Sequence, residues 1–287
     1  MIRTVRYSPT NTYLIEGRDG MLLFDTGWAG TFAAFCNAMG QLGISVQSIR
    51  AVMVSHFHPD HMGIVSDIAA CGAEIWVMDV QKDYVHAADG IFMKDARARF
   101  VPIDDSKVTL VPIGESRTML SKLGIDGEVL HTPGHSDDSV SLFLDSGELL
   151  VGDLNPLYEL PFHKGTPIGD SWEKLLSKKP KKVYYGHAKE ATLAETELRE
   201  ALPTGAETAH GRTEVTPEQK ETAPEQTDYY ALVKRIMKLI DKRTDLDTIA
   251  KKTGADRTLV EDVARMYLTH QNVGVQGILD RIEIKNR

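Results

Sequence analysis

Cysteine is scarce in this chain: Cys36 and Cys71 are the only two among 287 residues. Both lie in apolar segments with helical spacing, where a buried free thiol is the default, so we predict no disulfide. Long apolar runs are also missing, because the longest are strand-sized and far short of the ~20 residues that span a bilayer. These absences argue against a disulfide-stabilised scaffold and against a membrane protein.

An export signal is not recognisable either. Residues 1–7 run directly into polar residues, without an apolar core region or a small-residue cleavage site. We therefore expect a cytoplasmic protein with no membrane partner. A chain of this length can bury a large core, which favours an enzyme with one large domain and an appendage.

Positive charge is in short supply, with 33 Lys and Arg against 41 Asp and Glu. Residues 1–202 alone carry 19 basic and 27 acidic side chains. A protein that acts on RNA or DNA is expected to offer a basic surface to the phosphate backbone. Nucleic acid is therefore the less favoured partner, and we expect a small-molecule substrate.

Histidine and aspartate, in contrast, are concentrated in the segment SHFHPDH, residues 55–61, which follows an apolar run. If the strand continues into this segment, His56 and His58 point the same way, because side chains of a strand repeat every two residues. The proline that follows ends the strand and lets Asp60 and His61 approach from the other side. A histidine-rich surface loop is the alternative, but such loops seldom follow a buried strand with this spacing. The segment predicts a metal site.

Other strand-to-turn corners each carry one more residue of a metal-binding type. Their residues are Asp25, His135, Asp153 and His187. Each has an ordinary explanation by itself, since an aspartate can cap a turn and a lone histidine is more often hydrogen-bonded in a core. Together with residues 55–61 these residues make five such corners in one chain, and each corner would need a separate ordinary explanation.

In this order the residues resemble the motif set of the metallo-β-lactamase superfamily, over about residues 1–195. The resemblance implies two metal groups and one bridging ligand: His56, His58 and His135; Asp60, His61 and His187; and Asp153 as the bridge. It also implies that Asp25 accepts hydrogen bonds that orient the ligand cluster.

The implied chemistry is that of a dinuclear metal-dependent hydrolase with a bridging hydroxide as the nucleophile. A divalent cation lowers the pKa of bound water from 15.7 to about 7, so no serine or cysteine is needed. Asp60 is the expected catalytic residue, because it can orient the hydroxide as well as bind metal. We expect two zinc ions; a mixed His/Asp set also accepts iron, manganese or cobalt.

Tyr158 and His163, which follow Asp153 in the chain, are candidates for substrate contact and for protonation of the leaving group. A packed or solvated position in the loop is the alternative for each. Lactonases of the superfamily use a tyrosine soon after the bridging aspartate, but the spacing to Tyr158 differs.

The bridging Asp153 is shared with glyoxalase II, lactonases, ribonuclease Z and related phosphodiesterases of the superfamily. The resemblance therefore implies a hydrolase and leaves the bond open. We favour a small-molecule ester, thioester or lactone. The alternatives are a phosphodiesterase or ribonuclease of the same fold, and a non-catalytic metal-bound metabolite sensor with a nucleic-acid-binding C-terminal domain.

Strand and helix patterns alternate through both halves of residues 1–202. Strands are predicted at about 12–16, 21–25, 51–56, 74–78, 108–112, 127–131, 139–144, 148–152 and 182–185. Helices are predicted at 31–42, 62–70 and 171–179, the last with Asp170 as its N-cap. This order predicts an α/β fold, a four-layer αβ/βα sandwich with the metal ligands along one edge.

The remaining chain differs in character. Residues 203–224 are rich in Thr, Glu, Gly, Ala and Pro and predict a linker. Residues 225–287 predict a small all-α domain that opens with a helix at 228–243, and 246–263 resembles a helix-turn-helix. Its twelve basic and ten acidic side chains are a weak excess for DNA. A homodimer contact or a cover over the active site is favoured instead.

Overall fold

The computed structural model describes residues 1–92, 99–163, 165–193, 226–242, 244–257, 259–260 and 263. The chain divides into two compact units, Met1–Thr204 and Gly205–Arg287. All the predicted site residues belong to the first unit. The predicted linker at 203–224 and the predicted helical domain beyond residue 263 lie outside the described residues.

The larger sheet of the first unit is built from the N-terminal half. Its strands, in spatial order, are β1 (Ile2–Val5), β2 (Thr12–Glu16), β3 (Met21–Phe24), β4 (Ile49–Met53), β5 (Glu74–Met78) and β6 (Val108–Val111). The pairs β1–β2 and β2–β3 are antiparallel, and the sheet is parallel from β3 to β6. The carboxyl ends of β3 and β4 therefore lie at the same edge.

The smaller sheet contains the later strands in the order β11, β10, β9, β8, β7. Their bounds are β7 (Gly127–His131), β8 (Val140–Leu144), β9 (Glu148–Leu150), β10 (Lys182–Tyr184) and β11 (Ala191–Thr192). Only β9 and β10 pair in parallel, so these two strands end at one edge. The short edge strands β1 and β11 are absent from the sequence-based prediction.

The two sheets pack face to face. Side chains along the strands of the larger sheet alternate between two buried apolar clusters, one on each face of that sheet. Tyr13, Ile15 and Phe24 enter a buried cluster shared with Leu142 and Leu150 of the other sheet. The intervening residues, such as Leu14 and Leu23, enter a second cluster on the outer face of the larger sheet. Both faces of the sheet are thus covered, and each fully buried Leu or Phe contributes about 1.5–3 kcal/mol.

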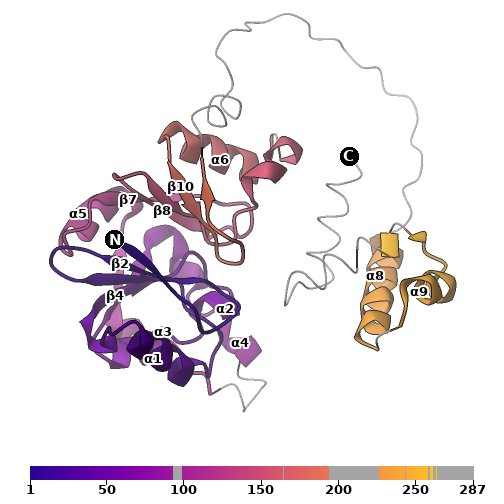
Figure 1. Ribbon diagram of the computed structural model, residues 1–287, viewed down its shortest axis with the longest axis horizontal. Coiled ribbons are helices and arrows are strands. Elements are labelled where there is room, and N and C mark those ends of the chain that lie inside the picture. The colour runs from indigo at the N-terminus through magenta and orange to yellow at the C-terminus, as the bar shows by residue number, and fades with distance from the viewer. Residues whose placement is uncertain are drawn as a thin grey trace, which may run out of the picture. The chain divides into compact units, whose positions relative to one another are not determined.

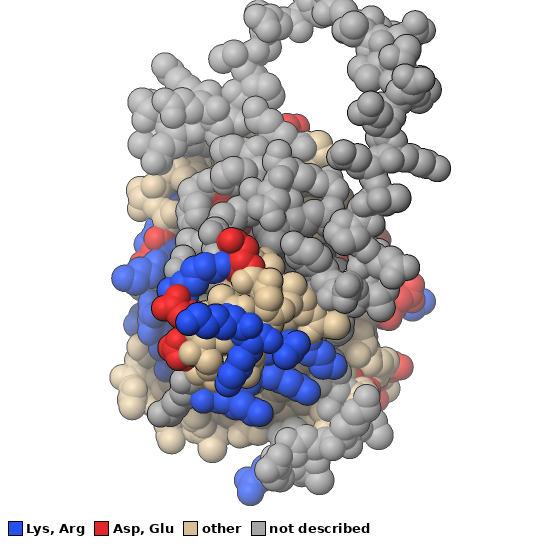
Figure 2. All heavy atoms as spheres, turned by 90° about the vertical axis from the view of Figure 1, so that its right-hand side faces the viewer, with Lys and Arg blue, Asp and Glu red and all other residues tan. Residues whose placement is uncertain are grey.

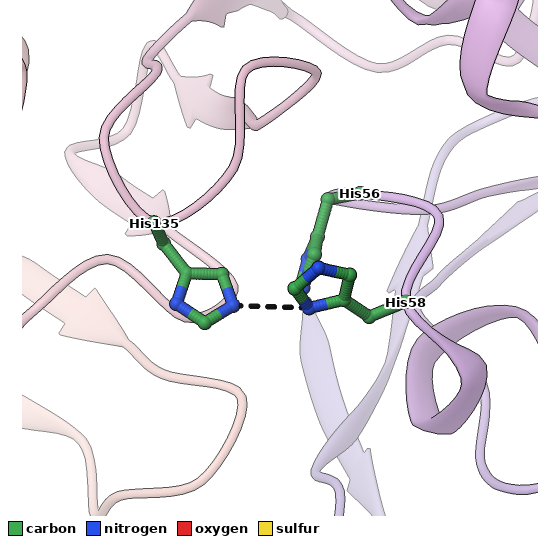
Figure 3. A group of neighbouring side chains, drawn as sticks. All are labelled: His56, His58 and His135. Carbon is green, nitrogen blue, oxygen red and sulfur yellow. Dashed lines mark hydrogen bonds between the residues drawn. The ribbon is translucent and has the colours of Figure 1, made fainter. Parts of the chain in front are cut away.

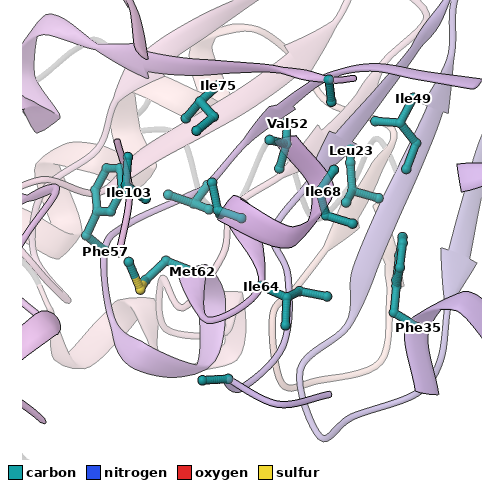
Figure 4. Packing of buried hydrophobic residues seen from close by; sticks show 14 of the residues in the cluster. Leu23, Phe35, Ile49, Val52, Phe57, Met62, Ile64, Ile68, Ile75 and Ile103 are labelled. Atoms are coloured by element: carbon teal, nitrogen blue, oxygen red, sulfur yellow. The ribbon is translucent and has the colours of Figure 1, made fainter. Parts of the chain in front are cut away.

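Helices form the two outer layers (Figure 1). The larger sheet is covered by α1 (Phe32–Gln41), α2 (Pro59–Met62) and α3 (Val65–Ala70), whose buried side chains include Phe35, Met62 and Ile68 (Figure 4). The smaller sheet is covered by α6 (Pro167–Ser177), where Trp172 is fully buried. The predicted four-layer sandwich is confirmed.

Shorter elements complete the unit. They are α4 (Asp89–Phe92), α5 (Ser116–Ser121), and the 3-10 turns η1 (Val46–Ser48), η2 (Asp79–Tyr84), η4 (Asp105–Lys107), η5 (Ile113–Glu115) and η6 (Leu157–Phe162). The prediction that Asp170 caps α6 is wrong, because the helix begins one turn earlier. Thr166 is its N-cap and accepts a hydrogen bond from the Gly169 amide at 3.4 Å, with a proline at the first helical position.

The described part of the second unit is helical. It contains α8 (Gln226–Asp241) and α9 (Leu246–Thr253), which share a small apolar core that includes Val233, Ile236 and Ile249. Asp245 caps α9 by accepting from the Thr248 amide at 2.9 Å, and Gly254 ends it in a left-handed conformation. Lys and Arg side chains gather on the face in Figure 2; exposed basic residues of this unit include Lys234, Arg235, Lys238, Lys242, Lys251 and Lys252.

Cys36 and Cys71 are free thiols, but both are partly exposed rather than buried as expected. Within the described ranges, no helix is long and apolar enough to cross a bilayer.

Candidate metal centre

The predicted ligand residues meet where strands of both sheets end. β4 stops at Met53, so His56 and His58 lie in the loop that follows it and not on the strand, which corrects the prediction of a strand through residue 56. Pro59 is the first residue of α2 and does not end a strand. Because proline suits the first helical turn, it starts the helix that carries Asp60 and His61.

Three imidazoles form the first ligand group. His56, His58 and His135 each offer a ring nitrogen, and these nitrogens all lie within 4.8 Å of one another. His135 approaches from the β7–β8 loop and places its Nε2 atom 3.1 Å from Nδ1 of His58 (Figure 3). The group therefore joins the larger sheet to the smaller one.

The second ligand group consists of Asp60, His61 and His187. His187 follows β10, and its Nε2 atom lies 2.9 Å from Oδ2 of Asp60 and 3.3 Å from Nε2 of His61. His61 is fully buried, whereas the other two side chains are partly exposed. This group also takes its residues from both sheets.

Asp153, which follows β9, lies between the two groups. Its Oδ1 atom is 3.2 Å from Nε2 of His61, and its Oδ2 atom is 3.5 Å from His187 and 3.6 Å from His135. One carboxylate thus contacts a residue of each group, which is the position that a bridging ligand requires.

Asp25 supports the cluster from the end of β3. It adopts a left-handed backbone conformation with φ of 62°, which costs a non-glycine residue about 1–3 kcal/mol and is tolerated where the surroundings enforce it. Its carboxylate accepts hydrogen bonds from the Ser55 amide at 2.6 Å and the Ser55 hydroxyl at 3.0 Å. The same carboxylate lies 3.1 Å from Nδ1 of His61, so Nε2 of that ring is directed at the cluster.

The histidines of the two groups differ in proton affinity. Burial lowers the pKa of His56 well below its usual value, and the neighbouring rings of His61 and His135 lower it further. Burial also lowers the pKa of His58. Both rings are therefore neutral at pH 7, which is the form that binds a metal ion.

In the second group the pKa values of the histidines are shifted in the opposite direction, upward. Burial alone would lower the pKa of His61, but the carboxylates of Asp153 and Asp25 outweigh it and raise the pKa well above the usual value. The pKa of His187 is raised as well, because contacts with Asp60 and Asp153 outweigh burial.

The two carboxylates of the cluster stay ionised. Burial would raise the pKa of Asp153, but the adjacent rings of His61, His187 and His56 outweigh it and lower the pKa well below the usual range. The pKa of Asp60 is lowered in the same way, with His187 and His61 opposing burial.

The donor set fits divalent cations. Nε2 of His56 is buried and receives no hydrogen bond from the described residues, while Nδ1 of the same ring is 3.0 Å from the Ser55 hydroxyl. Donors that share a tetrahedral ion at about 2.1 Å lie about 3.4 Å apart. The separations of 3.1 and 3.3 Å between ring nitrogens are close to that figure.

Several supporting residues could not be inferred from the sequence. Thr10, Asn11, Gln81 and Asp138 contact the ligand loops, yet they lie in segments without a motif. Their one signal is position: Thr10 and Asn11 precede β2, Gln81 follows β5, and Asp138 is three residues from His135.

The part that His163 was predicted to play, as a contact to the substrate or leaving group, stays a prediction. His163 is not among the described residues whose ligand atoms cluster; its side chain is 2% exposed, and its Nε2 atom lies 3.9 Å from Oε2 of Glu159. The side chain of Tyr158 lies outside the described residues.

Gly186 provides a test of the cluster geometry. A Cβ atom there would lie 2.5 Å from Oδ1 of Asp153 and 2.9 Å from Cε1 of His61, so Gly186→Ala is expected to displace Asp153. We expect metal affinity, measured by competition with a chelating dye, to fall about 10- to 100-fold, as for other residues that orient ligands. Gly114→Ala is the matched control, because a Cβ atom there meets open space. Equal affinities of the two variants would contradict the geometry described.

Fold and site together define a class: a four-layer α/β sandwich with a His/Asp-rich candidate metal centre at the rim where its sheets meet. Residues 5–187 match the family model described as the metallo-beta-lactamase superfamily, and the chain belongs to this superfamily. The chain is 26% identical over 185 residues to the beta-lactamase-like protein 2 homolog of Drosophila melanogaster. This match covers 62% of the chain and 58% of that protein, so the chain spans little more than half of its relative.

Solved structures show the same fold. The metallo-beta-lactamase family protein TTHA1429 from Thermus thermophilus superposes with a TM-score of 0.52 at 17% identity, over 100% of this chain and 93% of that one. TTHA1623 in a di-iron-bound form superposes with a TM-score of 0.50 at 24% identity, over 71% of this chain and 98% of that one.

Proposed function

We propose that the protein is a dinuclear metal-dependent hydrolase that acts on a small-molecule ester, thioester or lactone. The observation that carries this proposal is the place of Asp153, whose two carboxylate oxygens face His61 of one ligand group and His135 of the other. Superfamily membership supports a hydrolase, and the seven clustered side chains support two cations. When bound, such cations supply a water nucleophile with a pKa near 7 and positive charge facing the oxyanion that forms.

The chain's own residues have distinct parts in this proposal. His56, His58 and His135 would hold one cation, and Asp60, His61 and His187 the other. Asp25 would keep His61 in the orientation that leaves Nε2 available.

Asp60 is the proposed catalytic residue. Its Oδ2 atom lies 2.9 Å from His187 and 3.5 Å from the Thr10 hydroxyl, so the carboxylate is held in place. Its lowered pKa keeps it ionised, and it remains partly exposed. An ionised carboxylate can accept a hydrogen bond from the nucleophilic water and so orient it.

The nature of the cations and of the substrate is part of the proposal. Imidazole-rich sites suit zinc, which we propose; the di-iron form of TTHA1623 makes iron the first alternative. A small uncharged acyl substrate suits the excess of acidic over basic side chains in residues 1–202, 27 against 19.

The test is a hydrolysis screen of the metal-loaded chain over ester, thioester, lactone and phosphodiester substrates. We expect turnover in at least one of the first three classes, its loss with a chelator and its return with metal. Asp60→Asn should lower kcat about 100-fold or more, because a misplacement of the reacting atoms by about 1 Å has a cost of that order. Turnover of phosphodiesters alone would favour the phosphodiesterase alternative. Full metal occupancy without turnover in any class would favour a sensor.

A further inference from the structure

The ligands are divided between the two sheets, so the site exists only where the sheets are held in register. The loop after β4 and helix α2 supply His56, His58, Asp60 and His61, while the smaller sheet supplies His135, Asp153 and His187. Because each group combines residues from both sides, a small sliding of one sheet against the other would separate the ligands of both groups.

Buried polar contacts connect the two sheets beside the first ligand group. Asp138 is 1% exposed, and its Oδ2 atom accepts a hydrogen bond at 2.7 Å from the amide of Phe57, the residue between His56 and His58. Gln81 is fully buried, and its Nε2 atom lies 3.1 Å from the Val54 carbonyl, 3.3 Å from the Ser55 carbonyl and 3.2 Å from the Asp138 carbonyl, so these three acceptors share its two N–H groups. Asp138 and Gln81 thus connect the loop of His56 and His58 to the loop of His135.

A different pair of residues, Thr10 and Asn11, connects the two sheets beside the second ligand group. The Thr10 hydroxyl donates to the Asp60 carbonyl at 2.8 Å, and Thr10 is 1% exposed. Nδ2 of the adjacent Asn11 donates to the carbonyls of Tyr185 at 3.0 Å and Ala188 at 2.9 Å, which lie on either side of His187. Two consecutive residues thus connect Asp60 to His187.

We propose that these two residue pairs are positioning devices, each for one ligand group. Asp138 and Gln81 set the spacing of the ligand group His56, His58 and His135, and Thr10 and Asn11 set the spacing of the group Asp60, His61 and His187. This inference rests on the proposed two-cation function. A backbone amide that loses a buried acceptor must find another, so the loop that carries it shifts. Residues that orient ligands in this way typically change metal affinity about 10- to 100-fold.

The experiment isolates one ligand group at a time in the full chain. His187→Ala removes a ligand of the second group and leaves the first group whole, and His135→Ala does the reverse. Zinc affinity is measured by calorimetry in each background, with and without Asp138→Ala or Thr10→Val. We expect Asp138→Ala to weaken zinc binding about 10- to 100-fold in the His187→Ala background only. Thr10→Val, which keeps the side-chain volume, should weaken it in the His135→Ala background only.

Controls separate positioning from folding. Asp138→Asn keeps an oxygen that can accept from the Phe57 amide and should retain the affinity, and Asp137→Ala removes a carboxylate next to it and should have no effect. Thermal unfolding of the metal-free variants monitors the fold. An equal loss of zinc affinity in both backgrounds, or no loss in either, would overturn the assignment of each residue pair to one ligand group. Absence of zinc binding in both backgrounds and in the unaltered chain would instead overturn the proposed function.

Discussion

Replacing Asp153 by asparagine is expected to weaken both ligand groups at once. The substitution keeps the shape of the side chain but removes the charge that lies between 3.2 and 3.6 Å from His61, His187 and His135. Without that charge, cations bound to the two groups would repel each other across the cluster. We expect metal content, measured by plasma mass spectrometry after dialysis, to fall from two equivalents to one or fewer.

Hydrolysis should fall further than metal content. Loss of a single electrostatic contact to a transition state costs about 100- to 1000-fold in kcat, and loss of a cation should cost at least the upper figure. Asp19→Asn is the matched control, since Asp19 is an exposed carboxylate in the β2–β3 turn. Retention of two metal equivalents and of activity in Asp153→Asn would show that this carboxylate does not connect the groups.

The position of Asp153 was predictable because it follows an apolar strand, and so were those of His135 and His187 near other strand ends. Ligand-type residues at strand ends are local features of a sequence, and the fold brings those ends to one rim. The path of the chain after β4 was harder to predict. The apolar run that forms β4 continues to Val54, but the strand ends at Met53, so alternation along a strand is the wrong reason for the convergence of His56 and His58.

The contacts that hold the rim together were not predictable. Asn11 meets Tyr185 across 174 positions of sequence, and Phe57 meets Asp138 across 81. No periodicity links such pairs, because their proximity results from the packing of one sheet on the other. The short edge strands were missed for a related reason: β11 has only two residues, and pairing with β10 rather than its own sequence defines it.

Metal binding to the second group is expected to depend strongly on pH. The pKa of His61 and that of His187 are raised above 6.5, mainly because Asp153 and the other adjacent carboxylates outweigh burial. Protons must therefore leave these rings before a cation binds, and affinity should rise with pH from 6.5 upward until the rings are neutral. The expected gain is about tenfold per pH unit for each proton released.

The first group should behave differently, because burial lowers the pKa of both His56 and His58 and leaves these rings neutral at pH 7. From pH 7 to pH 8, its affinity should therefore change less with pH than that of the second group. Calorimetry of zinc binding in buffers of different ionisation enthalpy counts the protons released. We expect fewer protons for the first equivalent than for the second at pH 7. The opposite order, or release of equal numbers of protons by both equivalents, would mean that His61 and His187 do not hold the protons that their carboxylate neighbours favour.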